Sequence, residues 1–200
     1  MLSAVNGSIY LTTNYDDFML MALLASRREA VKDFCRWTPT LLSDRSALAA
    51  NFQPSPEHAL VYHLHGHADE PRSIVVTEDD YLDFTVQVTR DLARSKGHIG
   101  QNVMLPGYVR KAITNNLLLF VGYSVRDQNL RVVLRTLWQA LTPASDRLNI
   151  ANQLRLEPGV TGADIDRIKT YLERHYEVSL KLQVYWGEAR EFAAELRKRL

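Results

Sequence analysis

The sequence contains little of several features that define particular classes of protein. Its single cysteine, Cys35, excludes an internal disulfide framework and any zinc site built from cysteine pairs. Lysine and arginine number 24 against 23 acidic residues, so a net charge of +1 provides no overall attraction for nucleic acid or an acidic membrane. No apolar run approaches the ~20 residues of a membrane helix, and the start, "MLSAVNGSIY", lacks the parts of a signal peptide. We therefore expect a soluble, cytoplasmic protein.

The chain does contain an alternation of strand-like and helix-like segments. This order predicts an α/β fold with a mainly parallel sheet, and 200 residues suit a single domain over residues 1–200. The predicted strands cover residues 8–13, 59–66, 73–77, 117–121, 147–156 and 178–186. The predicted helices cover residues 16–31, 78–95, 107–114, 130–141, 161–176 and 188–200, with a further short helix near 47–50.

Three segments share one context, in which an apolar strand ends in polar residues and a turn or helix begins. They are "YLTTNYDDF", "VYHLHGH" and "LLLFVGYSVRDQNL". In an open parallel sheet, ligands bind outside the carboxyl ends of the strands, where the strand order reverses. The three polar strand ends therefore predict one shared ligand site.

Helix capping is an alternative explanation for part of this pattern. A Ser or Thr followed three residues later by an acidic residue is a capping-box pattern, found for Thr13 with Asp16, Thr77 with Asp80, and Ser124 with Asp127. Capping alone would account for any of these residues. It does not require Asn14 or His65.

The segment "HLHGH" places three histidines at two-residue spacing. If the strand continues, His63 and His65 point to the same face, and Gly66 then frees His67 from strand geometry. A metal site would need further ligands that the sequence does not indicate, so core or surface histidines are favoured and no metal is expected. A histidine at the carboxyl end of a strand, followed by glycine, also suits a general base, because it titrates near neutrality.

Four segments in order, "TTNYDD", "LHGH", "IVVTEDDY" and "FVGYSVRDQNL", resemble the sirtuin-like domains of bacteria, most closely those of anti-phage defence proteins that hydrolyse NAD. The resemblance extends to the closing "VYWGEAREFAAELRKR". It implies a Rossmann-like sheet with helices on both faces and NAD across its switch point. It also implies an NAD+ glycohydrolase that releases nicotinamide and ADP-ribose without a metal.

The resemblance also assigns site residues. Asn14 and His65 are the implied catalytic pair. The residues implied to bind NAD are Thr13, Asp16, Gly66, Gly122, Tyr123, Ser124 and Asp127, and Asp127 remains open to the capping interpretation.

The sequence departs from the family at its start. The family places a glycine-rich phosphate loop before the "TTNYD" strand, whereas here thirteen residues precede Asn14, Gly7 is their only glycine, and no G-x-G occurs. The chain thus resembles the C-terminal two-thirds of the family's domain. An unpaired first strand would favour homo-oligomerisation or a partner chain. The second hypothesis is a non-catalytic regulatory module that binds NAD or ADP-ribose, or a fragment that needs a partner segment.

Overall fold

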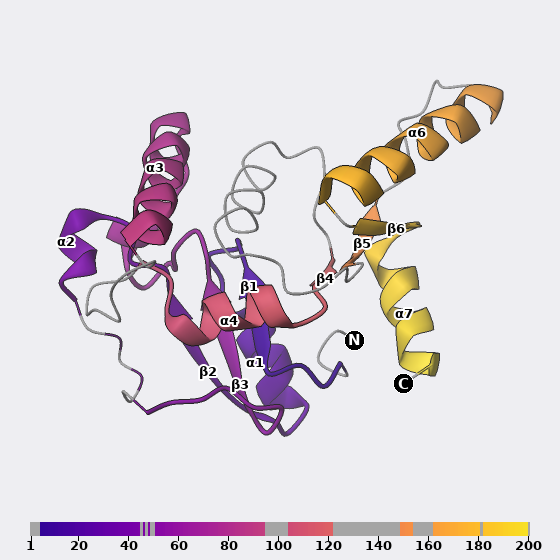
Figure 1. Ribbon diagram of the computed structural model, residues 1–200. Helices are drawn as coiled ribbons and strands as arrows, with labels where there is room; N and C mark the ends of the chain where they lie inside the picture. The colour runs from indigo at the N-terminus through magenta and orange to yellow at the C-terminus, as the bar shows by residue number, and fades with distance from the viewer. Residues whose placement is uncertain are drawn as a thin grey trace. The chain divides into compact units, whose positions relative to one another are not determined.

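The computed structural model of the chain describes residues 5–44, 46, 48, 51–94, 104–121, 149–153, 162–180 and 182–199 (Figure 1). Contacts divide the chain into two compact units, one ending at Ala112 and the other beginning at Ile113. The single domain over residues 1–200 stays a prediction. The predicted helix at 130–141 lies outside the described residues, as does most of the one near 47–50.

The N-terminal unit is built on a three-stranded parallel sheet. Its strands are β1 (Ile9–Thr12), β2 (Glu29–Phe34) and β3 (His58–His63), in the order β1-β3-β2. The last residues of all three strands are level, because Thr12 and Phe34 both pair with His63. The carboxyl ends of the strands, and the loops that follow β1 and β3, therefore meet at one edge of the sheet.

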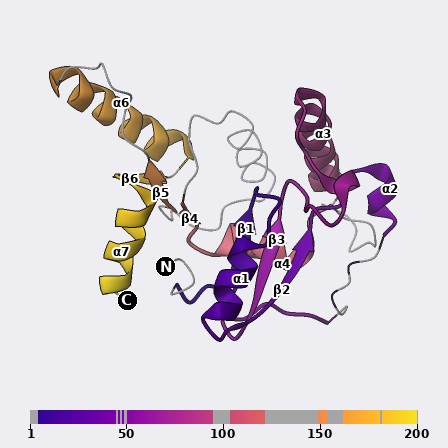
Figure 2. The ribbon, with the colours of Figure 1, turned by 180° about the vertical axis from the view of Figure 1, so that it is seen from behind.

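Helices cover both faces of this sheet. The helices of the unit are α1 (Phe18–Ala25), α2 (Pro39–Leu42), the 3-10 helix η2 (Pro71–Ser73), α3 (Glu78–Arg94) and α4 (Gly107–Asn115). Figures 1 and 2 show α1 and α4 on opposite faces. On the α1 face, Leu23 packs against Ala59 and Val61 of β3 in a fully buried cluster. The central strand β3 is buried on both faces, as expected for a parallel sheet covered by helices.

The predicted helix over residues 16–31 is wrong at its C-terminal end. The helix α1 ends at Ala25, and β2 begins four residues later at Glu29. Arg27 makes the turn with φ of 58°, while the backbone N–H of Arg28 donates to the carbonyl of Leu23 (3.2 Å). Glycine usually occupies this left-handed position, and its absence hid the end of the helix from sequence analysis.

The predicted strand over residues 73–77 is also wrong. This segment follows η2 and has no strand among the described elements; instead the backbone N–H of Val75 donates to the carbonyl of His65 (3.0 Å). The next prediction is confirmed, since α3 spans Glu78–Arg94. Its capping box forms as the pattern predicts, because Asp80 N donates to Thr77 Oγ1 (3.1 Å) and Thr77 N donates to Asp80 Oδ2 (2.8 Å).

The C-terminal unit contains a second parallel sheet. Its strands β4 (Leu119–Phe120), β5 (Asn149–Gln153) and β6 (Leu182–Trp186) pair in that order, and its helices are α6 (Gly162–Leu180) and α7 (Ala189–Arg199). Ala151, Tyr176 and Leu182 form its buried cluster. The strand predicted from residue 178 starts later than expected, because α6 continues to Leu180.

Parallel sheets flanked by helices confirm the predicted α/β, Rossmann-like fold class. Within the described parts of the chain, no helix is both long enough and apolar enough to cross a lipid bilayer.

Candidate functional site

The loops that follow β1 and β3 are joined at the carboxyl edge of the N-terminal sheet. The backbone N–H of Ala68 donates to the carbonyl of Tyr15 (3.0 Å), and the Tyr15 hydroxyl donates to the carbonyl of Val75 (2.6 Å). His63 Nδ1–H donates to the carbonyl of Asn14 (2.9 Å). Two of the three polar strand ends recognised in the sequence therefore lie together.

The predicted residues after β1 are accessible. Asn14 is exposed, while Thr13 and Asp16 are half-buried. The alternative interpretation, in which Thr13 and Asp16 form a capping box, is wrong, because α1 begins only at Phe18. Asp16 nevertheless contacts the start of the helix, since its Oδ1 accepts a hydrogen bond from the backbone N–H of Phe18 (2.9 Å). The amide side chain of Asn14 is therefore the most accessible of the three predicted groups.

The predicted residues after β3 are buried. His65 is 3% exposed, and its ring makes edge contacts with Tyr81 (5.2 Å between centroids) and Phe84 (5.3 Å) of α3. Gly66 has φ of +89°, in the region that favours glycine. A Cβ on Gly66 would lie 2.1 Å from the carbonyl oxygen of Ser73, so the position admits no side chain.

The interpretation that His63 and His65 share a face is wrong. The strand β3 ends at His63, and the turn at Gly66 brings His67 back toward it, with the two ring centroids 4.5 Å apart. His63 and His67 are 0% and 3% exposed. The two histidines that meet are therefore His63 and His67, while His65 points to α3.

The protonation of His63 follows from its neighbours. A carbonyl oxygen can only accept, so Nδ1 carries the proton that is shared with Asn14, and Nε2 of the neutral ring carries a lone pair. Burial lowers the pKa of His63, and the hydrogen bond to the Asn14 carbonyl opposes this only in part. Nε2 is buried, and it has no hydrogen-bond partner among the described residues.

His67 belongs to a network of charged side chains. Its Nδ1 accepts from the backbone N–H of Asp69 (3.0 Å), so Nε2 carries the proton and donates to Asp17 Oδ1 (3.0 Å). Lys32 of β2 donates to both carboxylate oxygens of Asp17 (2.9 and 2.8 Å) and to Asp69 Oδ2 (2.8 Å). One ammonium group thus joins the loop after β1 to the loop after β3.

The network shifts the pKa values of its members. Hydrogen bonds from Lys32 lower the pKa of Asp17 and of Asp69. For Lys32, burial lowers the pKa, but the hydrogen bonds to the two carboxylates outweigh burial and raise it overall. Lys32 and both aspartates are therefore charged at neutral pH.

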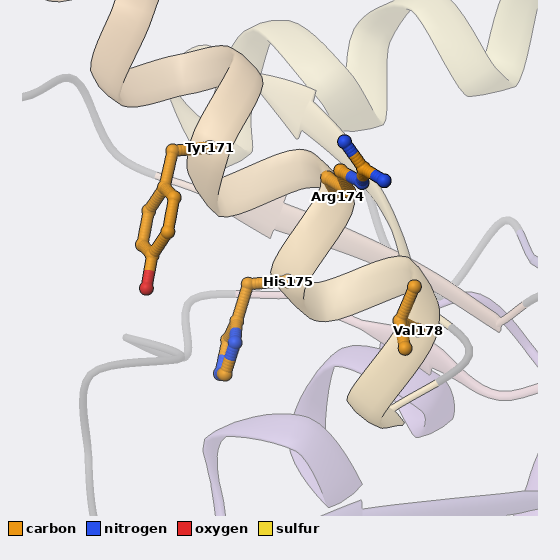
Figure 3. Close-up of a pocket in the computed structure, with 4 residues that line it drawn as sticks. All are labelled: Tyr171, Arg174, His175 and Val178. Atoms are coloured by element: carbon orange, nitrogen blue, oxygen red, sulfur yellow. The ribbon is translucent and has the colours of Figure 1, made fainter.

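The structure does not describe the positions of the residues predicted at the third polar strand end. These residues, Gly122, Tyr123, Ser124 and Asp127, lie outside the described parts of the chain. An open hollow of about 220 Å³ lies elsewhere, on α6 of the C-terminal unit. Figure 3 shows its four lining residues, Tyr171, Arg174, His175 and Val178, all on this one helix. None of them is a predicted site residue, and one helix surface does not enclose a ligand.

Asp17 and Lys32 were not predicted as members of the site, and His67, although placed at this edge, was assigned no role in it. Lys32 lies on β2, a strand that was not predicted: its residues 29–31 were assigned to the end of a helix and Lys32 to no element, so its approach to the sheet edge was not visible. Asp17 was overlooked beside Asp16, which fits the capping pattern. The signal that could have found Lys32 is the alternation of "EAVKDF", in which Ala30, Lys32 and Phe34 share one face of a strand.

The parallel strands and the helices that flank them define a Rossmann-like α/β domain, and the polar loops at the carboxyl ends of the strands form its candidate ligand site. The model of the SIR2-like domain family matches residues 8–151, and the chain belongs to this family. No curated protein is significantly similar to the chain. The family uses NAD as a substrate, and the predicted sirtuin-like identity is confirmed.

Proposed function

We propose that the protein is an NAD+ glycohydrolase, which cleaves NAD+ to nicotinamide and ADP-ribose in the cytoplasm as part of a bacterial anti-phage defence system. The observation that carries the proposal is the match to the SIR2-like family across a region that includes both Asn14 and His65. The defence role rests on the sequence resemblance described above.

The accessible polar groups after β1 suit the ribose of NAD+. The exposed amide of Asn14 can both donate to and accept from ribose hydroxyls or a water molecule, and half-buried Thr13 and Asp16 adjoin it. Asp16 accepts from the backbone N–H of Phe18 with Oδ1, and a carboxylate has further lone pairs that can accept from a ribose hydroxyl. These residues fit the nicotinamide half of the substrate.

The reaction breaks the bond between C1′ of the ribose and the pyridinium nitrogen. The electron pair of that bond leaves with nicotinamide, the sugar passes through an oxocarbenium-like state, and water adds to C1′ and loses a proton. In the proposed roles, Asn14 holds the water or the ribose hydroxyls, and His65 accepts a proton from one of them. Neither role requires a metal.

The burial of His65 favours a second candidate function. With Tyr81 and Phe84 against its ring, His65 is 3% exposed, so a substrate reaches it only after these side chains move. A regulatory module that binds NAD or ADP-ribose through Asn14, without turnover, would not need this movement. A chain that requires a partner segment belongs to the same alternative.

Nicotinamide release by the purified chain tests the two candidates. The informative variants are Asn14→Ala and His65→Gln, since glutamine keeps much of the volume of a buried histidine while removing its titration. Matched controls are Asn51→Ala and His58→Gln, which change exposed residues of the same types in the same unit. Binding of NAD+ is measured in parallel from the shift in melting temperature.

The hydrolase proposal predicts turnover by the unaltered chain and both controls, with loss of turnover in both variants. Binding without turnover would establish the regulatory module instead. If neither occurs, the chain needs a partner segment. Turnover that survives both substitutions would refute the assignment of Asn14 and His65.

A further inference from the structure

One buried atom is explained neither by the fold nor by the proposed function: Nε2 of His63. The ring is fully buried, Nδ1 is used by the Asn14 carbonyl, and Nε2 has no hydrogen-bond partner among the described residues. A buried acceptor without a donor costs about 1–3 kcal/mol. Such an atom needs an explanation, and a bound ion that completes it is one.

Two other donor groups lie beside this ring. One ring nitrogen of His63, one ring nitrogen of His67 and one carboxylate oxygen of Asp17 all lie within 4.8 Å of one another. Two imidazoles and a carboxylate form a donor set that open zinc sites use, with water in the remaining position. In a tetrahedral site with metal–ligand bonds of about 2.1 Å, the donor atoms lie about 3.4 Å from one another. The three donor atoms would therefore have to move closer together by roughly 1 Å when a metal binds. Asp17 lies in a loop with its side chain 35% exposed, which leaves room for this movement.

We propose that Asp17, His63 and His67 bind a divalent transition-metal cation of the zinc class, with Nε2 of His63 as one of its ligands. The proposal is independent of the NAD chemistry, which needs no metal. It also revises the expectation from "HLHGH", since Asp17 supplies the third ligand that the sequence did not indicate.

The surroundings of both histidines suit metal binding. Histidine ligands usually donate their other ring N–H to a carbonyl or carboxylate, as His63 Nδ1 does to Asn14. With its proton on Nδ1, the His63 ring presents the lone pair of Nε2, which is the group that a cation binds. For His67 the proton moves from Nε2 to Nδ1 on binding. Nδ1 then no longer accepts from the backbone N–H of Asp69 (3.0 Å) and donates instead toward Asp69 Oδ2, which lies 3.5 Å away.

Lys32 is the cation that competes for this position. Its ammonium contacts both carboxylate oxygens of Asp17 and lies 3.4 Å from His67 Nε2. A metal would displace it from Asp17, while its bond to Asp69 (2.8 Å) could persist. The ion-pair network by itself explains why Asp17 and His67 are where they are, but it leaves Nε2 of His63 unexplained.

The test is a titration of the full, tag-free chain, stripped of metal with a chelator, with Co2+ followed by visible absorption and with Zn2+ as competitor. The ligand variants are Asp17→Asn and His67→Gln, and Lys32→Met removes the competing ammonium. His58→Gln is the matched control, because His58 also contacts a carboxylate, that of Glu29 (2.7 Å), but is exposed. Circular dichroism establishes that each variant is folded.

We expect one Co2+ per chain, displaced by Zn2+, with affinity at least tenfold lower in each ligand variant, since even changes to groups around metal ligands cost about 10- to 100-fold. His58→Gln should bind as the unaltered chain does. Lys32→Met should bind up to about fivefold more tightly, as expected when a competing, half-buried ion pair near the surface is removed. Nitrogen-15 spectra of the histidine side chains should show Zn2+ shifting Nε2 of His63.

Two results would overturn the proposal. One is no binding of Co2+ or Zn2+ at millimolar concentration by the folded chain. The other is binding that leaves the Nε2 signal of His63 unmoved, or that persists unchanged in Asp17→Asn and His67→Gln. The nitrogen-15 measurement uses the unaltered chain, so it tests the proposal even if a variant fails to fold.

Discussion

Substitution of Gly66 by alanine should destabilise the protein more than a single methyl group would suggest. Gly66 forms the turn between His65 and His67 with φ of +89°. An added Cβ would lie 2.1 Å from the oxygen and 2.3 Å from the carbonyl carbon of Ser73. These are backbone atoms, so a change of side-chain rotamer cannot relieve the clash.

Ser73 is also held in place by its own hydrogen bonds. Its carbonyl accepts from Trp37 Nε1 (2.7 Å), its Oγ accepts from the backbone N–H of His67 (3.0 Å), and its own N–H donates to the carbonyl of Glu70 (2.9 Å). A non-glycine residue at this backbone angle costs about 1–3 kcal/mol. Overpacking adds a further 1–3 kcal/mol, roughly. The expected loss is therefore about 2–6 kcal/mol, a large part of a typical stability of about 5–15 kcal/mol.

Urea unfolding followed by far-ultraviolet circular dichroism measures this loss. Gly107→Ala is the matched control, because no atom lies within 4 Å of a Cβ at that position, which begins α4. Alanine favours helix over glycine by about 1 kcal/mol, so the control should be unchanged or slightly more stable. If Gly66→Ala loses less than about 1 kcal/mol relative to this control, the turn is not as tight as described.

Two further predictions concern the start of α3 and the buried side chain of His63. Thr77→Ala removes the hydroxyl that accepts from Asp80 N, and it should lower the free energy of unfolding in urea by about 1 kcal/mol. The control is Thr89→Ala inside the same helix, which should cost little. Equal losses in the two variants would contradict the capping role of Thr77. Because the folded pKa of His63 lies below its unfolded value of about 6.5, the unfolded chain binds more protons below that pH, so stability should fall as the pH falls through 6.5. His63→Gln should reduce the difference in stability between pH 7.5 and pH 5.5, and an unchanged difference would show that other groups cause it.

The sequence predicted β3 from its continuous apolar run, although the apolar segment 73–77, predicted in the same way, is not a strand. In β3, five of the six residues are buried, and such a run can hardly be solvent-exposed. The strand β2 is mixed, since Glu29 and Val31 are exposed while Asp33 is buried. Buried Asp33 accepts from Arg36 Nη1 (2.8 Å) and Ser46 Oγ (2.7 Å), a compensation that only the folded chain reveals. Polarity at this buried position therefore concealed the strand, whose first three residues were predicted as the end of a helix.

The sequence was sufficient to locate the candidate site, but it did not predict which side chains meet there. The rule that ligands meet parallel strands at their carboxyl ends placed Asn14 and the three histidines at one edge, and the structure brings these loops together. Which histidines meet depends on where β3 ends, because a strand that continued to His65 would have placed His63 and His65 on one face. The positive φ of Gly66 instead pairs His63 with His67. A count of histidines cannot predict this pairing.

Asn14 connects the two proposals through a single residue. Its side-chain amide is proposed to hold the substrate, while its backbone carbonyl accepts the proton of His63 Nδ1. A cation on Nε2 would withdraw electron density from the ring, make Nδ1–H a stronger donor, and hold the Asn14 carbonyl more firmly. An asparagine fixed in advance loses less conformational entropy when NAD+ binds, so the metal should strengthen substrate binding. Linkage then requires NAD+ to strengthen metal binding by the same factor, whether or not turnover follows.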